Sequence, residues 1–340
     1  MGKRDDAIRN VVNLRRAARA AGSVESAITK LVKPLSTKGF PYRKPNVPRG
    51  VEVPREPSNL GADFETDWAR KYPARLGRAL WIEGPMRLFV KGVASPQVKG
   101  LDRLEDLRNR DNPPPLIFTP NHHSHLDTPL STYAIPEPWR HRLMVAAAAD
   151  FFFTSKVKGS AAALALNALP IDRDSTGRKS ADQIRDLIAD GWSLLIYPEG
   201  GRSPDGWGQD FKGGAAYLSA RTGAAVVPMF IDGTGPIFGK GMTRPKPGRT
   251  TVVFGAPMTP GEHENTRRFN ARIEAAVTLL GDESLTDYWT SRRNAAVGAS
   301  PKLTGPEYNG WRRQWALTEQ RQTGEMGIRR RQKRRWPDLG

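Results

Sequence analysis

The chain has 340 residues, of which 38% are hydrophobic, and it carries a formal net charge of +18. This length suits one large domain with extensions or two modest domains, and the absence of cysteine excludes disulfides, thiolate metal sites and a cysteine nucleophile. Residues 1–50 hold 12 Lys and Arg against 3 Asp and Glu, and residues 281–340 hold 12 against 7, so residues 51–280 carry only +4. Basic ends indicate an anionic partner, either a lipid surface or nucleic acid, unless they only keep the protein soluble.

The N-terminal part has two helical patterns separated by a linker. Residues 5–35 have the spacing of a basic helix, and residues 39–60 are rich in Pro and charge. Residues 74–95 mix apolar side chains with Arg and Lys, and Pro85 is expected to kink or end a helix there. This segment fits an interfacial membrane helix and a helix packed on the core equally well. No run reaches the about 20 apolar residues of a membrane span, and no signal peptide is expected.

Further along the chain, strand patterns alternate with helical patterns, which predicts an α/β fold with a central mixed sheet flanked by helices. The expected strands span residues 116–119, 193–197, 225–231 and 250–254, and the expected helices span 178–190, 214–222 and 266–280. The predicted organisation is a basic N-terminal helical extension and linker at 1–73, a main domain at 74–280 and a basic Trp-containing tail at 281–340. The tail includes the basic run Arg329–Arg335.

The segment from Asn121 to Asp127, Asn-His-His-Ser-His-Leu-Asp, lies between an expected strand and a helix. The ends of strands are where α/β proteins bind ligands. Asp127 can accept the Nδ1 proton of His122 and so leave Nε2 as a base for a hydroxyl group. Two other interpretations use the same residues. Ser124 and Asp127 have the spacing of a helix capping box, and His123, His125 and Asp127 have part of the pattern of a metal site.

A second polar segment, Tyr197–Ser203, follows the expected strand at 193–197. Its two glycines, Gly200 and Gly201, let the backbone approach a ligand closely, and Arg202 can bind a phosphate through two hydrogen bonds. Taken alone, the segment also fits a polar turn with an incidental Arg–Glu pair. A third segment ends in Arg173, which is either another phosphate ligand or part of an exposed salt bridge worth less than about 1 kcal/mol.

Together these segments resemble the glycerolipid acyltransferase family of the 1-acylglycerol-3-phosphate acyltransferase type. The family motif Asn-His-x-Ser-x-x-Asp, which contains the HX4D pattern, is matched by Asn121, His122, Ser124 and Asp127. The motif Phe-Pro-Glu-Gly-Thr-Arg-Ser is matched by residues 197–203, with Tyr197 in place of Phe and Gly201 in place of Thr. Looser motifs are matched near Arg173 and Pro228, and the resemblance covers about residues 100–260.

The resemblance implies that residues 74–280 form an acyltransferase domain in which His122 is the general base and Asp127 orients it. It implies a substrate-binding set comprising Asn121, Ser124, Arg173, Glu199, Gly200, Gly201, Arg202 and Ser203. It also implies an acyl-CoA or acyl carrier protein thioester as co-substrate, with no cofactor and no metal.

The expected reaction is acyl transfer to the hydroxyl of 1-acylglycerol 3-phosphate, which makes phosphatidate in phospholipid biosynthesis. Another lysophospholipid, glycerol 3-phosphate or a glycolipid is the alternative acceptor. The expected location is the cytoplasmic face of the cell membrane, with peripheral or monotopic attachment to the anionic surface. A different class of function is a basic protein that binds nucleic acid or membrane without catalysis. Nucleic acid is the weaker partner, since no nucleic-acid-binding fold signature accompanies the charge.

Overall fold

The structure is a computed structural model that describes residues 64–171, 178–203, 206–239 and 242–305. The predicted helix at 5–35, the linker at 39–60, Arg173 and the basic run Arg329–Arg335 lie outside the described residues. The boundaries expected at residues 73 and 280 stay predictions.

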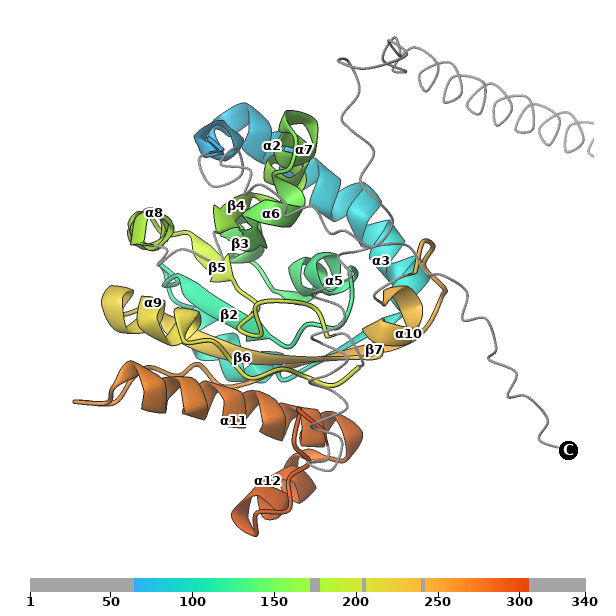
Figure 1. The fold of residues 1–340 in the computed structure, drawn as a ribbon, viewed down its shortest axis with the longest axis vertical. Helices are drawn as coiled ribbons and strands as arrows, with labels where there is room; N and C mark the ends of the chain where they lie inside the picture. The colour runs from blue at the N-terminus through green and yellow to red at the C-terminus, as the bar shows by residue number, and fades with distance from the viewer. Residues whose placement is uncertain (1–63, 172–177, 204–205, 240–241, 306–340) are drawn as a thin grey trace, which may run out of the picture. The chain divides into compact units, whose positions relative to one another are not determined.

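A seven-stranded sheet forms the centre of the described chain (Figure 1), in the order β1-β7-β6-β2-β5-β3-β4. Five of its neighbouring pairs are parallel, and β6 and β7 are antiparallel. This arrangement confirms the predicted α/β fold with a mixed central sheet. The strands are β1 (Pro96–Lys99), β2 (Leu116–Pro120), β3 (Leu143–Ala148), β4 (Ala168–Ile171), β5 (Ser193–Leu195), β6 (Ala225–Asp232) and β7 (Thr250–Phe254).

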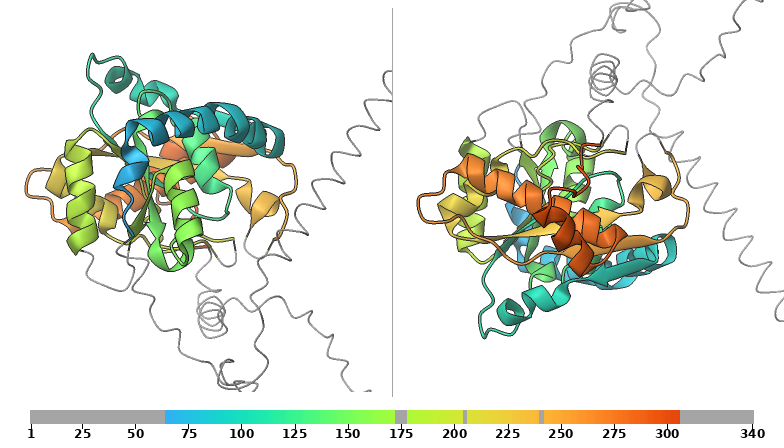
Figure 2. Two further views of the ribbon diagram at one scale, coloured as in Figure 1. Left: turned by 90° about the horizontal axis from the view of Figure 1, so that it is seen from above. Right: turned by 90° about the horizontal axis from the view of Figure 1, so that it is seen from below.

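Helices cover both faces of the sheet (Figures 1 and 2), with α2, α3, α5 and α7 on one face and α8, α9 and α11 on the other, and α12 packs against α11. The helices with their 3-10 and π turns are η1 (Asp67–Arg70), α2 (Tyr72–Trp81), η2 (Ile82–Met86), α3 (Arg87–Ala94), η3 (Leu101–Leu104), α4 (Glu105–Arg108), α5 (Asp127–Ala134), η4 (Arg140–Arg142), α6 (Ala149–Phe152), α7 (Lys156–Leu166), α8 (Arg178–Ala189), α9 (Gly214–Thr222), α10 (Thr234–Phe238), α11 (Thr266–Leu285) and α12 (Tyr288–Ala296).

Two apolar layers enclose the sheet, and successive strand residues belong to different layers. Leu116 and Phe118 of β2 pack with α3 and α5, whereas Ile117 packs with α9 and α11. Such alternation follows from the two-residue period of a strand, and each of these side chains is almost completely buried. The fully apolar character of β2 is typical of a strand covered on both faces.

Pro85 was expected to kink or end a helix, and the structure shows that the helix does not end there but contains an irregular turn. The chain passes from α2 through the π-helical turn η2 into α3, and both Ile82 and Arg87 keep right-handed helical backbone angles. The N–H of Arg87 donates to the carbonyl of Ile82, five residues earlier, which is the π-helical pattern. The wider turn accommodates the proline ring and its missing N–H. No helix among the described residues is long and apolar enough to cross a membrane.

Helix α11 is longer than predicted, because it continues to Leu285 rather than ending near residue 280. Its side chains Phe269, Ile273 and Val277 are buried on one face, at helical spacing, and they pack with β6. Helix α12 follows directly and lies inside the segment predicted as a tail.

The sheet order places the two conspicuous loops side by side. Strands β2 and β5 are parallel neighbours, with Phe118 paired to Leu195. The segment 121–127 follows β2, and the segment 197–203 follows β5. Because parallel neighbours end at the same edge, both loops leave the sheet at the carboxyl ends of its strands, where α/β proteins bind ligands.

Candidate active site

His122 and Asp127 form a hydrogen-bonded pair just beyond the end of β2. Nδ1 of His122 lies 2.9 Å from Oδ2 of Asp127, and the side chains are 17% and 0% exposed. The same carboxylate oxygen accepts the backbone N–H groups of His123 (2.7 Å) and Ser124 (2.8 Å). The turn therefore holds the carboxylate in place. The carboxylate in turn holds the imidazole with its proton on Nδ1, which leaves Nε2 as the basic nitrogen.

The capping interpretation of this segment is correct in part. Asp127 is the first residue of α5, and its bond to the Ser124 N–H is one half of a capping box. Ser124 does not supply the other half, because its buried hydroxyl accepts from the N–H of Leu126 (3.0 Å) and donates to the carbonyl of Phe238 (2.7 Å). A helix start and a histidine–carboxylate pair thus use the same aspartate.

Glu199 joins the second loop to the backbone of the first. One carboxylate oxygen accepts the N–H of His122 (2.8 Å), and the other accepts the N–H of Gln209 (2.9 Å). The N–H of Ser203 donates to the carbonyl of His122 (2.8 Å). Both the backbone N–H and the backbone carbonyl of His122 are therefore bonded to the second loop. These contacts set the position of the histidine relative to the glycines and Arg202.

Tyr197 packs against the candidate base. Its ring stacks on the His122 ring with centroids 4.0 Å apart and an angle of 23° between the planes. Its hydroxyl is 3.0 Å from the hydroxyl of Thr128 in α5. Burial raises the pKa of Tyr197 far above its ordinary value of 10.0, and the charge of Asp127 adds to this effect. The phenol therefore stays protonated and bridges the second loop and α5.

The two glycines of the second loop differ in what their positions require. Gly200 has a φ of +71°, and an added Cβ would lie 2.8 Å from the side chain of Lys212. At Gly201 an added Cβ would meet none of the described atoms within 4 Å. Glycine is therefore needed at 200 for its backbone conformation, whereas position 201 has room for the threonine of the family motif or for part of a ligand.

Asn121 is buried and is bonded to the sheet. Its amide donates to the carbonyl of Ile231 (2.9 Å), and its side-chain oxygen accepts the N–H of the same residue (2.7 Å). The asparagine thus continues the pairing of β2 with β6 after β2 has ended. Its polar atoms support the loop from below, and its predicted contact with substrate stays a prediction.

The structure brings most of the predicted site residues together and adds two neighbours, His125 and Tyr197, that were not in the predicted catalytic or substrate-binding set. Both His125, which accepts a hydrogen bond from Arg202, and Tyr197 contact predicted residues. An aromatic residue directly before the Pro-Glu-Gly run was the available signal for Tyr197. The predicted residues that gather around the two loops are Asn121, His122, Ser124, Asp127, Glu199, Gly200, Gly201, Arg202 and Ser203.

The metal interpretation of the first loop, with His123, His125 and Asp127 as ligands, finds no support in the contacts of its members. His125 uses Nε2 for Arg202, and Oδ2 of Asp127 is bonded to His122 and to two backbone N–H groups. Elsewhere among the described residues, Glu83, Glu137 and His141 bring possible ligand atoms within 4.8 Å of one another. Arg140 lies in that cluster, with Nη1 2.6 Å from Glu83. Burial acts to raise the pKa of Glu83, but Arg140 and the neighbouring cations lower it overall, which is typical of an ion-pair network.

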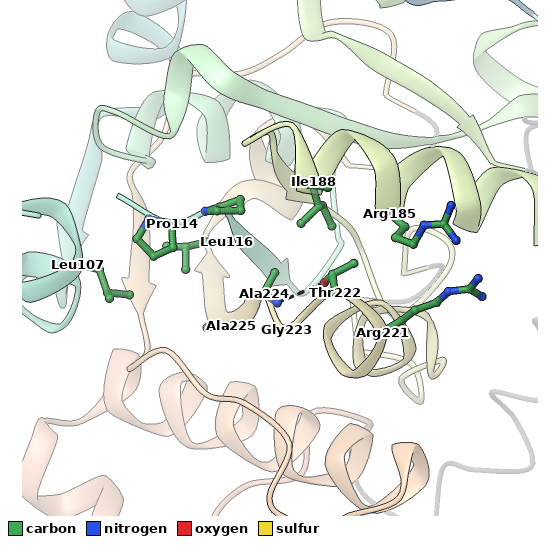
Figure 3. A pocket seen from close by; sticks show the side chains of 12 residues that line it. Leu107, Pro114, Leu116, Arg185, Ile188, Arg221, Thr222, Gly223, Ala224 and Ala225 are labelled. Carbon is green, nitrogen blue, oxygen red and sulfur yellow. Dashed lines mark hydrogen bonds between the residues drawn. The ribbon is translucent and has the colours of Figure 1, made fainter. Parts of the chain in front are cut away.

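A cavity of about 540 Å³ lies at the other end of the strands (Figure 3). Its lining includes Leu116, the first residue of β2, whereas His122 follows the last residue of that strand. Arg185 and Arg221 also line it, and both form ion pairs with Asp182 (3.3 and 2.9 Å). The length of β2 separates this cavity from the His122–Asp127 pair, so it is not the candidate active site.

Comparisons with known proteins agree with this geometry. A family model described as Acyltransferase matches residues 97–232. The chain is 30% identical over 181 residues to a 1-acyl-sn-glycerol-3-phosphate acyltransferase of Chlamydomonas reinhardtii, covering 50% of this chain and 51% of that protein. It is 31% identical over 151 residues to a chloroplastic 1-acyl-sn-glycerol-3-phosphate acyltransferase of Arabidopsis thaliana, covering 42% of this chain and 38% of that protein. The chain thus spans about half or less of the length of these relatives.

Among solved structures, the chain is similar to the 1-acyl-sn-glycerophosphate acyltransferase PlsC from Thermotoga maritima, with 21% identity and a TM-score of 0.47. That similarity covers 65% of this chain and 84% of that one. The family match spans both loops of the candidate site and confirms the resemblance found in the motifs. Residues 97–232 of this chain are thus similar to the Acyltransferase family.

Proposed function

We propose that the protein transfers an acyl group from a thioester, either acyl-CoA or acyl carrier protein, to the hydroxyl of 1-acylglycerol 3-phosphate and so makes phosphatidate. The observation that carries this proposal is the His122–Asp127 pair, which the second loop holds at the carboxyl ends of β2 and β5. The names of the two relatives support 1-acylglycerol 3-phosphate as the acceptor.

In the proposed reaction the acceptor hydroxyl donates its proton to Nε2 of His122 while its oxygen attacks the thioester carbonyl carbon. A carbon–oxygen bond forms, and the imidazolium is stabilised by the carboxylate of Asp127. When the tetrahedral intermediate collapses, the carbon–sulfur bond breaks and the proton on Nε2 passes to the leaving thiolate. No covalent bond to the protein is needed, because the thioester is already activated.

The acceptor phosphate is proposed to lie against the second loop. Arg202 offers a guanidinium group for a charge-assisted contact, and Gly201 leaves space beside it. Arg173, the other predicted phosphate ligand, follows β4, which is the outer neighbour of β3 in the sheet. We keep both arginines in the proposed binding set.

We further propose that the protein attaches to a membrane through the exposed face of α2, α3 and α7, in a peripheral or monotopic manner. On this face Tyr72 is 76% exposed, Leu80 67%, Leu88 72% and Val157 80%. Large exposed apolar side chains on neighbouring helices are typical of surfaces that bind a partner or a membrane. Lysines border the same helices, which suits an interface with anionic lipid.

The function is tested by measuring thiol release from oleoyl-CoA by the purified protein with liposomes, with and without 1-acylglycerol 3-phosphate. We expect release that requires the acceptor and a product that is phosphatidate. His122→Ala should lower kcat by about 10²- to 10⁴-fold, since the general base is lost. Circular dichroism should show that the variant keeps its fold.

A panel of acceptors separates the proposal from its alternatives. Glycerol 3-phosphate, other lysophospholipids and a glycolipid are tested under the same conditions, and acyl carrier protein replaces CoA in a parallel series. A better rate with another acceptor would replace the proposed substrate. Full activity of His122→Ala would contradict the mechanism.

A further inference from the structure

We infer that His125 is a positioning residue that holds Arg202 in the orientation needed to bind the acceptor phosphate. This inference rests on the proposed function, because it concerns how the proposed phosphate ligand is held. It assigns a role to a residue that falls on a variable position of the family motif.

The first support is the direct contact between the two side chains. Nη1 of Arg202 is within hydrogen-bonding distance of Nε2 of His125. A guanidinium nitrogen only donates hydrogen bonds, so Nε2 must be the acceptor and the imidazole carries its proton on Nδ1. A neutral acceptor fixes the direction of the guanidinium group without adding a negative charge next to the expected phosphate.

The second support is that the imidazole itself is fixed. The His125 ring packs on the Phe238 ring, with centroids 5.2 Å apart and an angle of 42°. The backbone N–H of His125 donates to the carbonyl of Phe238 (3.3 Å), the same carbonyl that accepts from the Ser124 hydroxyl. The end of α10 therefore sets the position of His125.

The third support is that the loop behind Arg202 is also held. The side-chain amide of Gln209 donates to the carbonyls of Gly201 (3.1 Å) and Arg202 (3.3 Å). With its backbone held by Gln209 and its guanidinium held by His125, Arg202 presents a preorganised cation. Preorganisation lowers the conformational entropy that ligand binding would otherwise lose.

The test is a double-mutant cycle on the full chain with 1-acylglycerol 3-phosphate as varied substrate and saturating oleoyl-CoA. We expect His125→Leu to raise the KM for the acceptor about tenfold, as the loss of a hydrogen bond to a charged group would, and to change kcat much less. His125→Gln should keep KM close to that of the native protein, because its side-chain oxygen can replace Nε2. In an Arg202→Ala background, His125→Leu should add nothing further.

His263→Gln is the matched control, because that histidine is an exposed loop residue outside the site, and its kinetics should be those of the native protein. Equal effects of His125→Leu with and without Arg202 would overturn the inference. A raised KM in a folded His125→Gln protein would do the same, and this second variant keeps the test usable if His125→Leu unfolds.

Calorimetric titration of the same variants with 1-acylglycerol 3-phosphate separates this inference from the proposed function. Native protein that binds this lipid without acylating it contradicts the proposed reaction. In that case the double-mutant cycle compares the dissociation constants of the variants in place of their KM values. Acylation with no dependence of KM on His125 contradicts only the inference. Native protein that neither binds nor acylates the lipid overturns both.

Discussion

At the scale of single residues, Tyr197 contacts both halves of the candidate site. Its ring lies on His122, and its hydroxyl meets Thr128 in α5. The family motif has phenylalanine here, which would keep the stacking and lose the hydroxyl contact. The effects of the ring and the hydroxyl can therefore be separated by one substitution.

We expect Tyr197→Phe to lower the free energy of unfolding by about 1 kcal/mol near neutral pH, since a buried hydrogen bond is lost. The stacked ring remains, so kcat should change little. The pKa of Tyr197 is raised in the folded protein, so above about pH 10 the unfolded chain loses the phenol proton while the folded chain keeps it. The native protein should therefore lose stability as the pH rises above about 10. The variant lacks the phenol and should not show this loss.

Urea unfolding at about pH 7 and about pH 10.5 measures the contribution of the hydrogen bond and the effect of the phenol proton on stability, because only the native protein carries this phenol. The stability difference between native protein and variant should shrink at the higher pH. A difference that stays constant or grows would show that Tyr197 is not held protonated in the folded state.

At the scale of elements, α11 supports the sheet on the face opposite α3 and α5. It packs along β6, the strand whose Ile231 is bonded to Asn121 in the first loop of the candidate site. Its buried stripe of Phe269, Ile273 and Val277 makes this contact. Its start is capped by Asn265, whose side chain accepts the N–H of Arg268 (2.9 Å).

Ile273→Ala should lower the free energy of unfolding by about 2–5 kcal/mol, because it removes buried methyl groups and leaves a cavity against the sheet. Arg267→Ala, at an exposed position of the same helix, should change it by less than about 0.5 kcal/mol. Chemical denaturation of the two variants checks this, and equal effects would contradict the packing of α11 on the sheet.

At the scale of the whole molecule, the largest group of exposed large apolar side chains among the described residues lies on α2, α3 and α7, and a smaller group lies at the end of α11 and on α12. Leu285, at the end of α11 on the other face, is 71% exposed. It provides a matched comparison for Leu80 and Leu88 on the proposed membrane face.

We expect Leu80→Asp and Leu88→Asp to weaken binding to phosphatidylcholine vesicles that contain phosphatidylglycerol, because each places a charge on the apolar surface facing the lipid. Leu285→Asp should bind as the native protein does. Cosedimentation with the vesicles measures the bound fraction. Equal loss for all three variants, or for none, would contradict the assignment of the membrane face to α2, α3 and α7.

The sequence predicted the elements whose signals are local. Helix α9 begins and ends where its pattern and the terminal Gly223 indicated, and strand β7 has its predicted bounds. The prediction left open whether Pro85 kinks or ends a helix, and the structure shows a π turn that keeps the helix continuous. The prediction also stopped α11 short of Leu285. At both places packing against other elements stabilises a helix beyond its local signals.

The sequence by itself determined the α/β class, the pairing of His122 with Asp127 and the polar loop after β5, because five-residue spacing and a strand followed by Gly and Arg are local patterns. Only the tertiary structure decided the strand order that places β5 beside β2. It also decided that His125 meets Arg202, 77 positions away in the chain. Such contacts depend on how apolar faces pack across the whole sheet, and the spacing of residues within one segment does not show this packing.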